Sequence, residues 1–122
     1  MSTLYVDDVA GQGGGTATSL MDGLLKVRAT YDQTGPTTEE TFNVTSITDV
    51  NTGDFTVNFT SNMGNATYQL LATAGGGVNV FIIGRSVGVD KTAALIDVQV
   101  ESNAGTDQDA ESIMLACAGE LA

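Results

Sequence analysis

Short runs in which apolar and polar residues alternate dominate this sequence. Residues 55–60 read Phe-Thr-Val-Asn-Phe-Thr, and residues 96–101 (Ile-Asp-Val-Gln-Val-Glu) and 27–32 (Val-Arg-Ala-Thr-Tyr-Asp) repeat the pattern. Phe42 and Val44 begin another run of this kind. Because successive side chains of a β-strand point to opposite faces, each run predicts a strand with one buried face. We therefore expect an all-β fold.

Three further runs are apolar at nearly every position, which is typical of strands that are covered on both faces. These are residues 68–74, 78–83 and 113–118. Between the runs lie Gly, Asn and Asp residues, and Asn51 and Gly53 predict a hairpin turn at residues 49–54 because both tolerate positive φ. Roughly seven short strands joined by such turns predict a small antiparallel β-sandwich or barrel-like module.

The N-terminal region differs from the remainder of the chain. Residues 11–15 read Gly-Gln-Gly-Gly-Gly, a flexible composition, and the only candidate helix is the short segment 19–25. We expect residues 1–15 to form an extended arm with a glycine-rich hinge, which either pairs with a neighbouring subunit or forms an edge strand of its own domain. Residues 16–122 then form a single β domain, since 122 residues suffice for one.

The composition limits the classes of partner. Fifteen acidic and four basic residues give a net charge of −11, which repels nucleic-acid phosphates and anionic lipid surfaces. We therefore expect neither a nucleic-acid partner nor a membrane. The aromatic share is only 6%, without Trp, so the core is built from small side chains and an isolated monomer should be only moderately stable. This favours a homo-oligomer.

The usual catalytic groups are missing or dispersed. The chain has no His, which excludes a Ser-His-Asp or Cys-His arrangement. The acidic pairs Asp7–Asp8 and Glu39–Glu40 are typical of solvated loops and arms, and the glycine runs at 13–15 and 75–77 lack the context of a phosphate-binding loop. We therefore predict no enzyme, no catalytic residues and no cofactor.

One acidic loop raises the question of calcium. Asp107, Asp109 and Glu111 alternate, with Asn103 nearby, but the central Gly and the late Glu of a calcium loop are missing. A solvated acidic turn is the favoured interpretation; no metal ligand is assigned, and calcium binding stays open. Cys117, the only cysteine, lies in an apolar run and is predicted to be a buried, inert thiol.

The most informative stretch is residues 41–60, which read Thr-Phe-Asn-Val-Thr-Ser-Ile-Thr-Asp-Val-Asn-Thr-Gly-Asp-Phe-Thr-Val-Asn-Phe-Thr. It resembles the hairpin "FNVSSITDNGTGDYTVNFT" of tail-fibre-like and other virion surface proteins of tailed bacteriophages, many of them marine. Residues 65–68 (Asn-Ala-Thr-Tyr), 21–29 and 1–9 are similar to the segments that accompany this hairpin. One extra or altered position at 49–52 suggests a longer hairpin loop.

The resemblance implies a β-rich, trimeric part that projects from the surface of a virion. Since the N-terminus lacks the pattern of a signal peptide, we expect synthesis in the host cytoplasm followed by incorporation into the particle. The predicted function is a non-enzymatic virion structural protein, a small accessory appendage or decoration such as a knob or short fibre, whose partners are further copies and capsid or tail proteins.

Two alternatives remain: a tail-fibre tip that binds the host receptor, and a lectin-like module that binds a surface glycan. Sugar-binding platforms normally use exposed aromatic rings. Of the three tyrosines, Tyr31 and Tyr68 fit core faces and Tyr5 lies on the arm.

Overall fold

A computed structural model describes residues 2–3, 8–9, 18–19, 24–76, 80–84 and 91–122. All regular structure in these residues is β-strand, and none of them forms a helix that could cross a bilayer. The strands are β1 (Asp8–Val9), β2 (Thr18–Ser19), β3 (Leu25–Asp32), β4 (Thr37–Phe42), β5 (Val44–Asn51), β6 (Asp54–Phe59), β7 (Gln69–Gly75), β8 (Val80–Gly84), β9 (Leu95–Ser102) and β10 (Ser112–Ala118).

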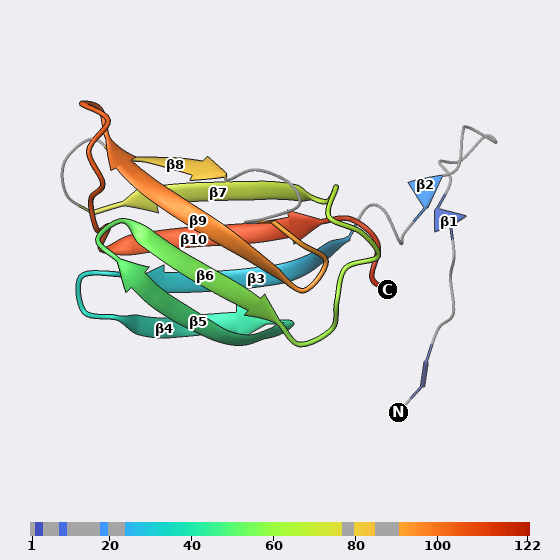
Figure 1. The fold of residues 1–122 in the computed structure, drawn as a ribbon. Coiled ribbons are helices and arrows are strands. Elements are labelled where there is room, and N and C mark those ends of the chain that lie inside the picture. The colour runs from blue at the N-terminus through green and yellow to red at the C-terminus, as the bar shows by residue number, and fades with distance from the viewer. Residues whose placement is uncertain (1, 4–7, 10–17, 20–23, 77–79, 85–90) are drawn as a thin grey trace.

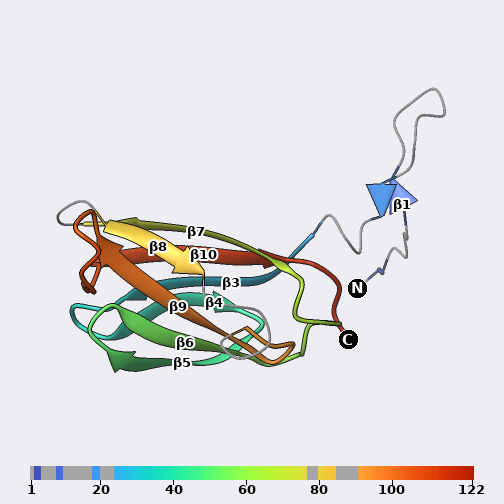
Figure 2. The same ribbon diagram turned by 45° about the horizontal axis from the view of Figure 1, so that its top comes forward.

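The body of the molecule is a sandwich of two antiparallel sheets, as predicted (Figure 1). One sheet has the strand order β4-β3-β10-β7 and the other the order β5-β6-β9-β8. Three hairpins stay within a sheet, namely β3–β4, β5–β6 and β8–β9, whereas the other connections carry the chain from one sheet to the other. The short pair β1–β2 lies apart from both sheets in both views (Figure 2).

The alternating runs form the inner faces of the two sheets. Their apolar residues meet between the sheets, where a fully buried side chain is worth a few kcal/mol. The core comprises Val27, Ala29, Tyr31, Phe55, Val57, Phe59, Met63, Tyr68, Ile96, Val98, Val100, Ala110, Ile113, Leu115 and Cys117. Two ring contacts link the layers: Tyr31 with Phe55 at 5.2 Å and Phe59 with Tyr68 at 5.6 Å between centroids. The predicted strands at 27–32, 55–60 and 96–101 are thus confirmed.

Asn43 turns the chain from one sheet to the other. It adopts φ = 56°, a left-handed conformation that Asn tolerates better than most residues. Its side chain accepts a hydrogen bond from the Ser61 amide at 2.7 Å and donates one to the Ser61 carbonyl at 3.0 Å. The expected continuous run through Phe42 and Val44 is therefore wrong: Phe42 ends β4, whereas Val44 begins β5 in the other sheet.

The hairpin at residues 49–54 is confirmed, but its loop is not lengthened. Asn51 pairs with Asp54 around Thr52 and Gly53, and the register shifts between Asp49 and Asn51. The extra residue, Val50, is thus accommodated as a β-bulge. Gly53 has φ = 70°, and its amide donates to Asp109 Oδ1 at 2.7 Å, which ties the turn to the β9–β10 connection.

The expected helix at residues 19–25 is wrong at both ends. Ser19 belongs to β2, which pairs with β1, and Leu25 begins β3 opposite Ala118 of β10. Pairing with β10 outweighs the weak helical signal, which Gly23 already opposed. Residues 20–23 lie outside the described part of the chain, as does most of the predicted arm at residues 1–15.

Candidate interaction surface

The outward side of the β4-β3-β10-β7 sheet carries two adjacent rows of side chains that run across all four strands. Residues that pair directly across antiparallel strands point to the same side of the sheet. The first row is Phe42, Arg28, Ala116 and Leu71, and the second row is Glu40, Thr30, Met114 and Thr73. We call these eight residues the outer face.

Large apolar side chains of the outer face are in contact with solvent. Phe42 and Leu71 are each 56% exposed and Met114 is 52% exposed. Beyond the two rows, Leu25 of β3 is also about half exposed. Contiguous exposed apolar area of this kind marks binding surfaces, whereas scattered single apolar residues do not.

The prediction that residues 68–74 and 113–118 are covered on both faces is therefore wrong within this chain. Burial in β10 alternates, with Ile113, Leu115 and Cys117 inside and Met114 outside. The inner side chains pack on the other sheet, and no described segment covers the outer ones. The described structure gives no burial for the side chains of the third run, at 78–83.

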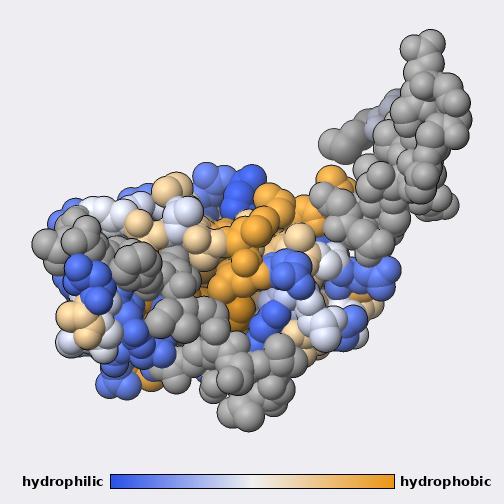
Figure 3. All heavy atoms as spheres, turned by 90° about the horizontal axis from the view of Figure 1, so that it is seen from above, coloured by the Kyte–Doolittle hydropathy of each residue, from blue (hydrophilic) through white to orange (hydrophobic). Residues whose placement is uncertain are grey.

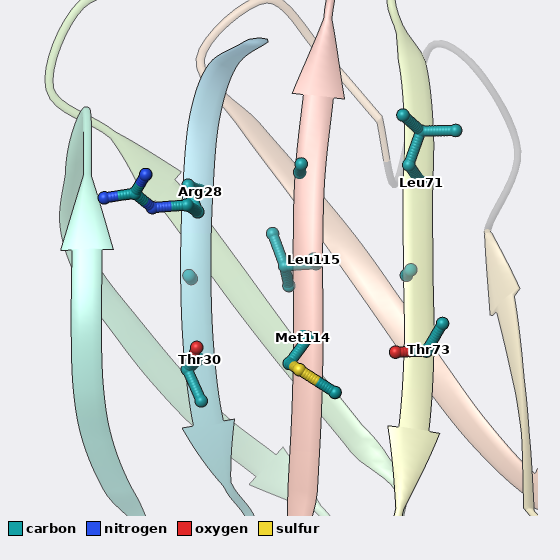
Figure 4. Close-up of a pocket in the computed structure, with 9 residues that line it drawn as sticks. Arg28, Thr30, Leu71, Thr73, Met114 and Leu115 are labelled. Carbon is teal, nitrogen blue, oxygen red and sulfur yellow. The ribbon is translucent and has the colours of Figure 1, made fainter.

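The outer face is uneven because long and short side chains lie next to one another. A shallow depression of about 340 Å³ lies over β3, β10 and β7 (Figure 4). Ala72, Ala116, Leu71 and Met114 help to line it, whereas the Arg28 side chain extends from β3 towards β4. Figure 3 views the molecule from the side on which β7 lies, at the top of Figure 1. In this view, hydrophobic residues form a band that is flanked by hydrophilic residues.

The charges of the outer face are balanced. Its two charged residues form an ion pair, with Arg28 Nη2 at 2.5 Å from Glu40 Oε1. Both side chains are more than half exposed, so the pair contributes at most about 1 kcal/mol to the stability of the monomer. The outer face is thus neutral in a chain whose net charge is −11.

On β5, β6 and β9 of the other sheet, several outward polar side chains form hydrogen bonds with one another across the strands. Thr56 donates a hydrogen bond to Asp97 across β6 and β9, and Asn58 donates to Ser46 at 3.2 Å across β6 and β5. Gln99 donates to Asp107 Oδ1 at 2.7 Å. Cross-strand pairs of this kind stabilise a solvated sheet without a partner.

The edge strands on one side of the sandwich are irregular. In β4 the register shifts between the partners of Glu40 and Thr38, which leaves Glu39 as an extra residue, and every residue of β4 is exposed. In β5 the register shifts twice. Bulges and charged side chains on edge strands oppose the addition of a further strand. Docking on this side is therefore expected on the outer face and not along an edge.

The acidic loop does not converge on a common point. Asp107 accepts from Gln99 and Asp109 from the Gly53 amide, while the Glu111 carboxylate lies beside Gly76. Among the described residues, no three His, Cys, Asp or Glu side chains are placed to hold a metal ion. The three carboxylates thus lie beside different parts of the chain.

The other residues singled out in the sequence are placed as follows. Cys117 is fully buried, and burial raises the pKa of its thiol to about 12. Tyr31 and Tyr68 lie in the core, while Tyr5 lies outside the described residues. Burial also raises the pKa of Tyr68, whose hydroxyl donates to the Leu95 carbonyl at 2.9 Å.

Of the acidic pairs, Glu39 and Glu40 are exposed on β4, and Asp8 lies in β1. Asp7 lies outside the described residues. The Glu40 carboxylate forms an ion pair with Arg28.

Sequence reasoning missed two buried polar residues, Lys26 and Gln33. Gln33 forms two hydrogen bonds with Ala110: the Gln33 backbone N–H donates to the Ala110 carbonyl at 3.0 Å, and the Gln33 side-chain Oε1 accepts from the Ala110 backbone N–H at 3.3 Å. Lys26 is the extra residue where the register of β3 against β10 shifts. No pattern in the sequence marks either position.

No protein-family model, curated protein or solved structure matches the chain. The fold and the outer face therefore define it as a small antiparallel β-sandwich with one uncovered apolar sheet face.

Proposed function

We propose that this protein is a non-enzymatic structural module that works by assembling with other protein surfaces, as a small accessory appendage or decoration on a tailed-phage virion. The single observation that carries the assembly is the outer face. It exposes Phe42, Leu71 and Met114 and carries one balanced ion pair, whereas outward polar side chains on β5, β6 and β9 form hydrogen bonds with one another. Covering such an area releases roughly 25 cal/mol per Å² of apolar surface.

The place in a virion rests on the resemblance of residues 41–60 to tailed-phage surface modules. The hairpin that this segment forms is fastened to the β9–β10 connection through Gly53 and Asp109. Its residues hold the sandwich together and leave the outer face to make contacts. Further copies of the chain and capsid or tail proteins are the partners that the resemblance favours.

Receptor or glycan binding is the weaker alternative. A sugar-stacking platform needs exposed aromatic rings, and Tyr31 and Tyr68 are both buried. Phe42 is exposed, but it stands at the edge of the outer face beside Arg28 and offers no hydrogen-bonding group for a sugar hydroxyl.

The proposal is tested by quantitative mass spectrometry of virions purified from cells that carry the gene. We expect peptides of this chain at a fixed ratio to a known capsid protein, retained through density-gradient purification. Their loss during purification would contradict a structural role. Binding of the isolated protein to a glycan array would instead favour the receptor-binding alternative.

A further inference from the structure

We propose that the outer face binds a second copy of the same chain, in a face-to-face dimer with two-fold symmetry. This inference deepens the proposed function and rests on it, since it names the first partner of the same surface. It is carried by the order of long and short side chains in the two rows.

On β3, β10 and β7, long and short side chains alternate along each row and are offset between the rows, whereas on β4 both rows carry a long side chain, Phe42 and Glu40. Across β3, β10 and β7, the first row runs long, short, long, and the second row runs short, long, short. The first row has Arg28, Ala116 and Leu71, and the second has Thr30, Met114 and Thr73. On these three strands, projecting side chains and hollows therefore alternate in both directions across the outer face.

A two-fold axis perpendicular to the strands, lying in the interface plane between the two rows, places projections over hollows on β3, β10 and β7, and on β4 it places Phe42 over Glu40 of the second copy. Each strand then faces the same strand of the other copy, and each row faces the other row. Met114 lies over Ala116 of the second copy and Leu71 lies over Thr73. Isologous interfaces need this kind of self-complementary surface, and sheets packed face to face interdigitate their side chains.

The same axis also matches the charges. Arg28 lies over Thr30 of the second copy, next to the copy's Glu40, because Thr30 and Glu40 are paired neighbours in the second row. The ion pair within each chain can therefore be exchanged for two pairs between the chains. Since the outer face is neutral, the net charge of −11 is kept away from the contact. A strongly basic partner would gain little attraction from this particular surface.

The area of the outer side suits a reversible dimer. Four strands spaced about 4.8 Å apart and about seven residues long cover roughly 19 by 23 Å. Two such faces bury on the order of 900 Å², which is below the roughly 1,000 Å² of a stable specific interface and within the range of weak, transient contacts. We therefore expect a dissociation constant of roughly 1–100 µM.

The first experiment measures molar mass by sedimentation and by light scattering over a concentration series of the full chain. We expect a shift from one copy to two copies as the concentration rises. The Met114→Glu variant should weaken this association at least about tenfold, because it places a carboxylate in the contact. Val50→Glu is the matched control: Val50 is similarly exposed, at 49%, but lies on the β5 bulge, and its variant should dimerise like the wild type. Circular dichroism establishes that both variants are folded.

The second experiment uses the exchanged charges. Arg28→Glu and Glu40→Arg should each dimerise more weakly than the wild type, because every charge on the outer face then has one sign. An equimolar mixture should regain association as a heterodimer, since the carboxylates of the first variant then meet the guanidinium groups of the second across the contact. No rescue on mixing would overturn the two-fold arrangement.

The outcomes separate this inference from the proposed function. A mass of one copy at every concentration, or of three copies, overturns the dimer, and virion-associated peptides would still support the structural role. A dimer that depends on Met114 supports the inference, even if virions contain no peptide of this chain and the virion role fails.

Discussion

The outward sides of the two sheets differ in the side chains that they expose to water. On β5-β6-β9, polar side chains such as Thr56 and Asp97 bond to one another across the strands and can remain in water. On β3-β10-β7, Leu71 and Met114 stand exposed with small residues between them. The first set of side chains is satisfied within the chain, whereas we propose that the second is completed by another copy of the chain.

The largest expected change in unfolding free energy comes from a comparison of one residue type, Phe, in the core and on the outer face. Phe55 is fully buried and Phe42 is 56% exposed. Phe55→Ala removes a ring from the packed core and should lower the free energy of unfolding by about 3–5 kcal/mol. Phe42→Ala should change it by less than about 1 kcal/mol. Urea denaturation of dilute monomer measures both; equal losses would mean that the outer face supports the fold itself.

A somewhat smaller effect is expected at the turn that joins the resembling hairpin to the sandwich. A Cβ at Gly53 would lie 2.5 Å from the Val100 carbonyl oxygen and 2.7 Å from the Gln108 amide nitrogen, with φ at 70°. Gly53→Ala should therefore cost about 2–3 kcal/mol of unfolding free energy. Gly35→Ala is the matched control, because no atom outside Gly35 and its two chain neighbours lies within 4 Å of its Cβ position. A Gly53→Ala chain as stable as the control would show that the turn is not tightly held.

High pH should weaken the core. Burial raises the pKa of Cys117 from 9.0 to about 12 and also raises that of Tyr68. Between pH 9 and 12 the folded chain keeps the thiol proton that the unfolded chain releases, so the unfolding free energy falls as pH rises. The slope for this group approaches about 1.4 kcal/mol per pH unit. Urea titrations from pH 7 to 11 should show the decline, and Cys117→Ala should make it shallower. An unchanged slope in that variant would exclude the thiol as a cause.

The smallest effect compares the two outward sides directly. Thr56→Val deletes the hydrogen bond to Asp97 and should cost about 1 kcal/mol of unfolding free energy. Thr73→Val on the outer face makes the same change of shape and should leave monomer stability within about 0.5 kcal/mol. Thermal denaturation at low concentration measures both variants. A larger loss for Thr73→Val would remove the contrast between the two sides.

The alternating runs predicted most of the fold. A two-residue repeat of apolar and polar side chains indicates which face of a strand is buried. Residues 27–32, 55–60 and 96–101 obey that rule and form inner faces. The hairpin at 49–54 was equally readable, because Gly53 supplies the positive φ that the turn needs. Alternation does not indicate the position at which the chain passes from one sheet to the other. Asn43 interrupts the run from Phe42 to Val44, and its side chain forms hydrogen bonds with the distant Ser61.

The candidate surface was visible in the sequence only indirectly. Apolar residues on both sides of residues 68–74 and 113–118 indicate that both sides are covered, and sequence alone does not say by what. The order of long and short side chains in the outer face depends on the register of β10 against both neighbours, which is a long-range property. The buried Gln33 was equally unreadable, since its partner Ala110 lies far along the chain.

The most direct test of the uncovered face is peroxide oxidation of methionine, mapped by peptide mass spectrometry at several protein concentrations. Met114 is 52% exposed and Met63 is 1% exposed, so the two serve as probe and internal reference. In dilute solution Met114 should oxidise much faster than Met63, and its rate should fall severalfold as the concentration reaches the range of assembly. A Met114 rate that stays the same at every concentration would contradict the claim that this face is covered by another copy of the chain.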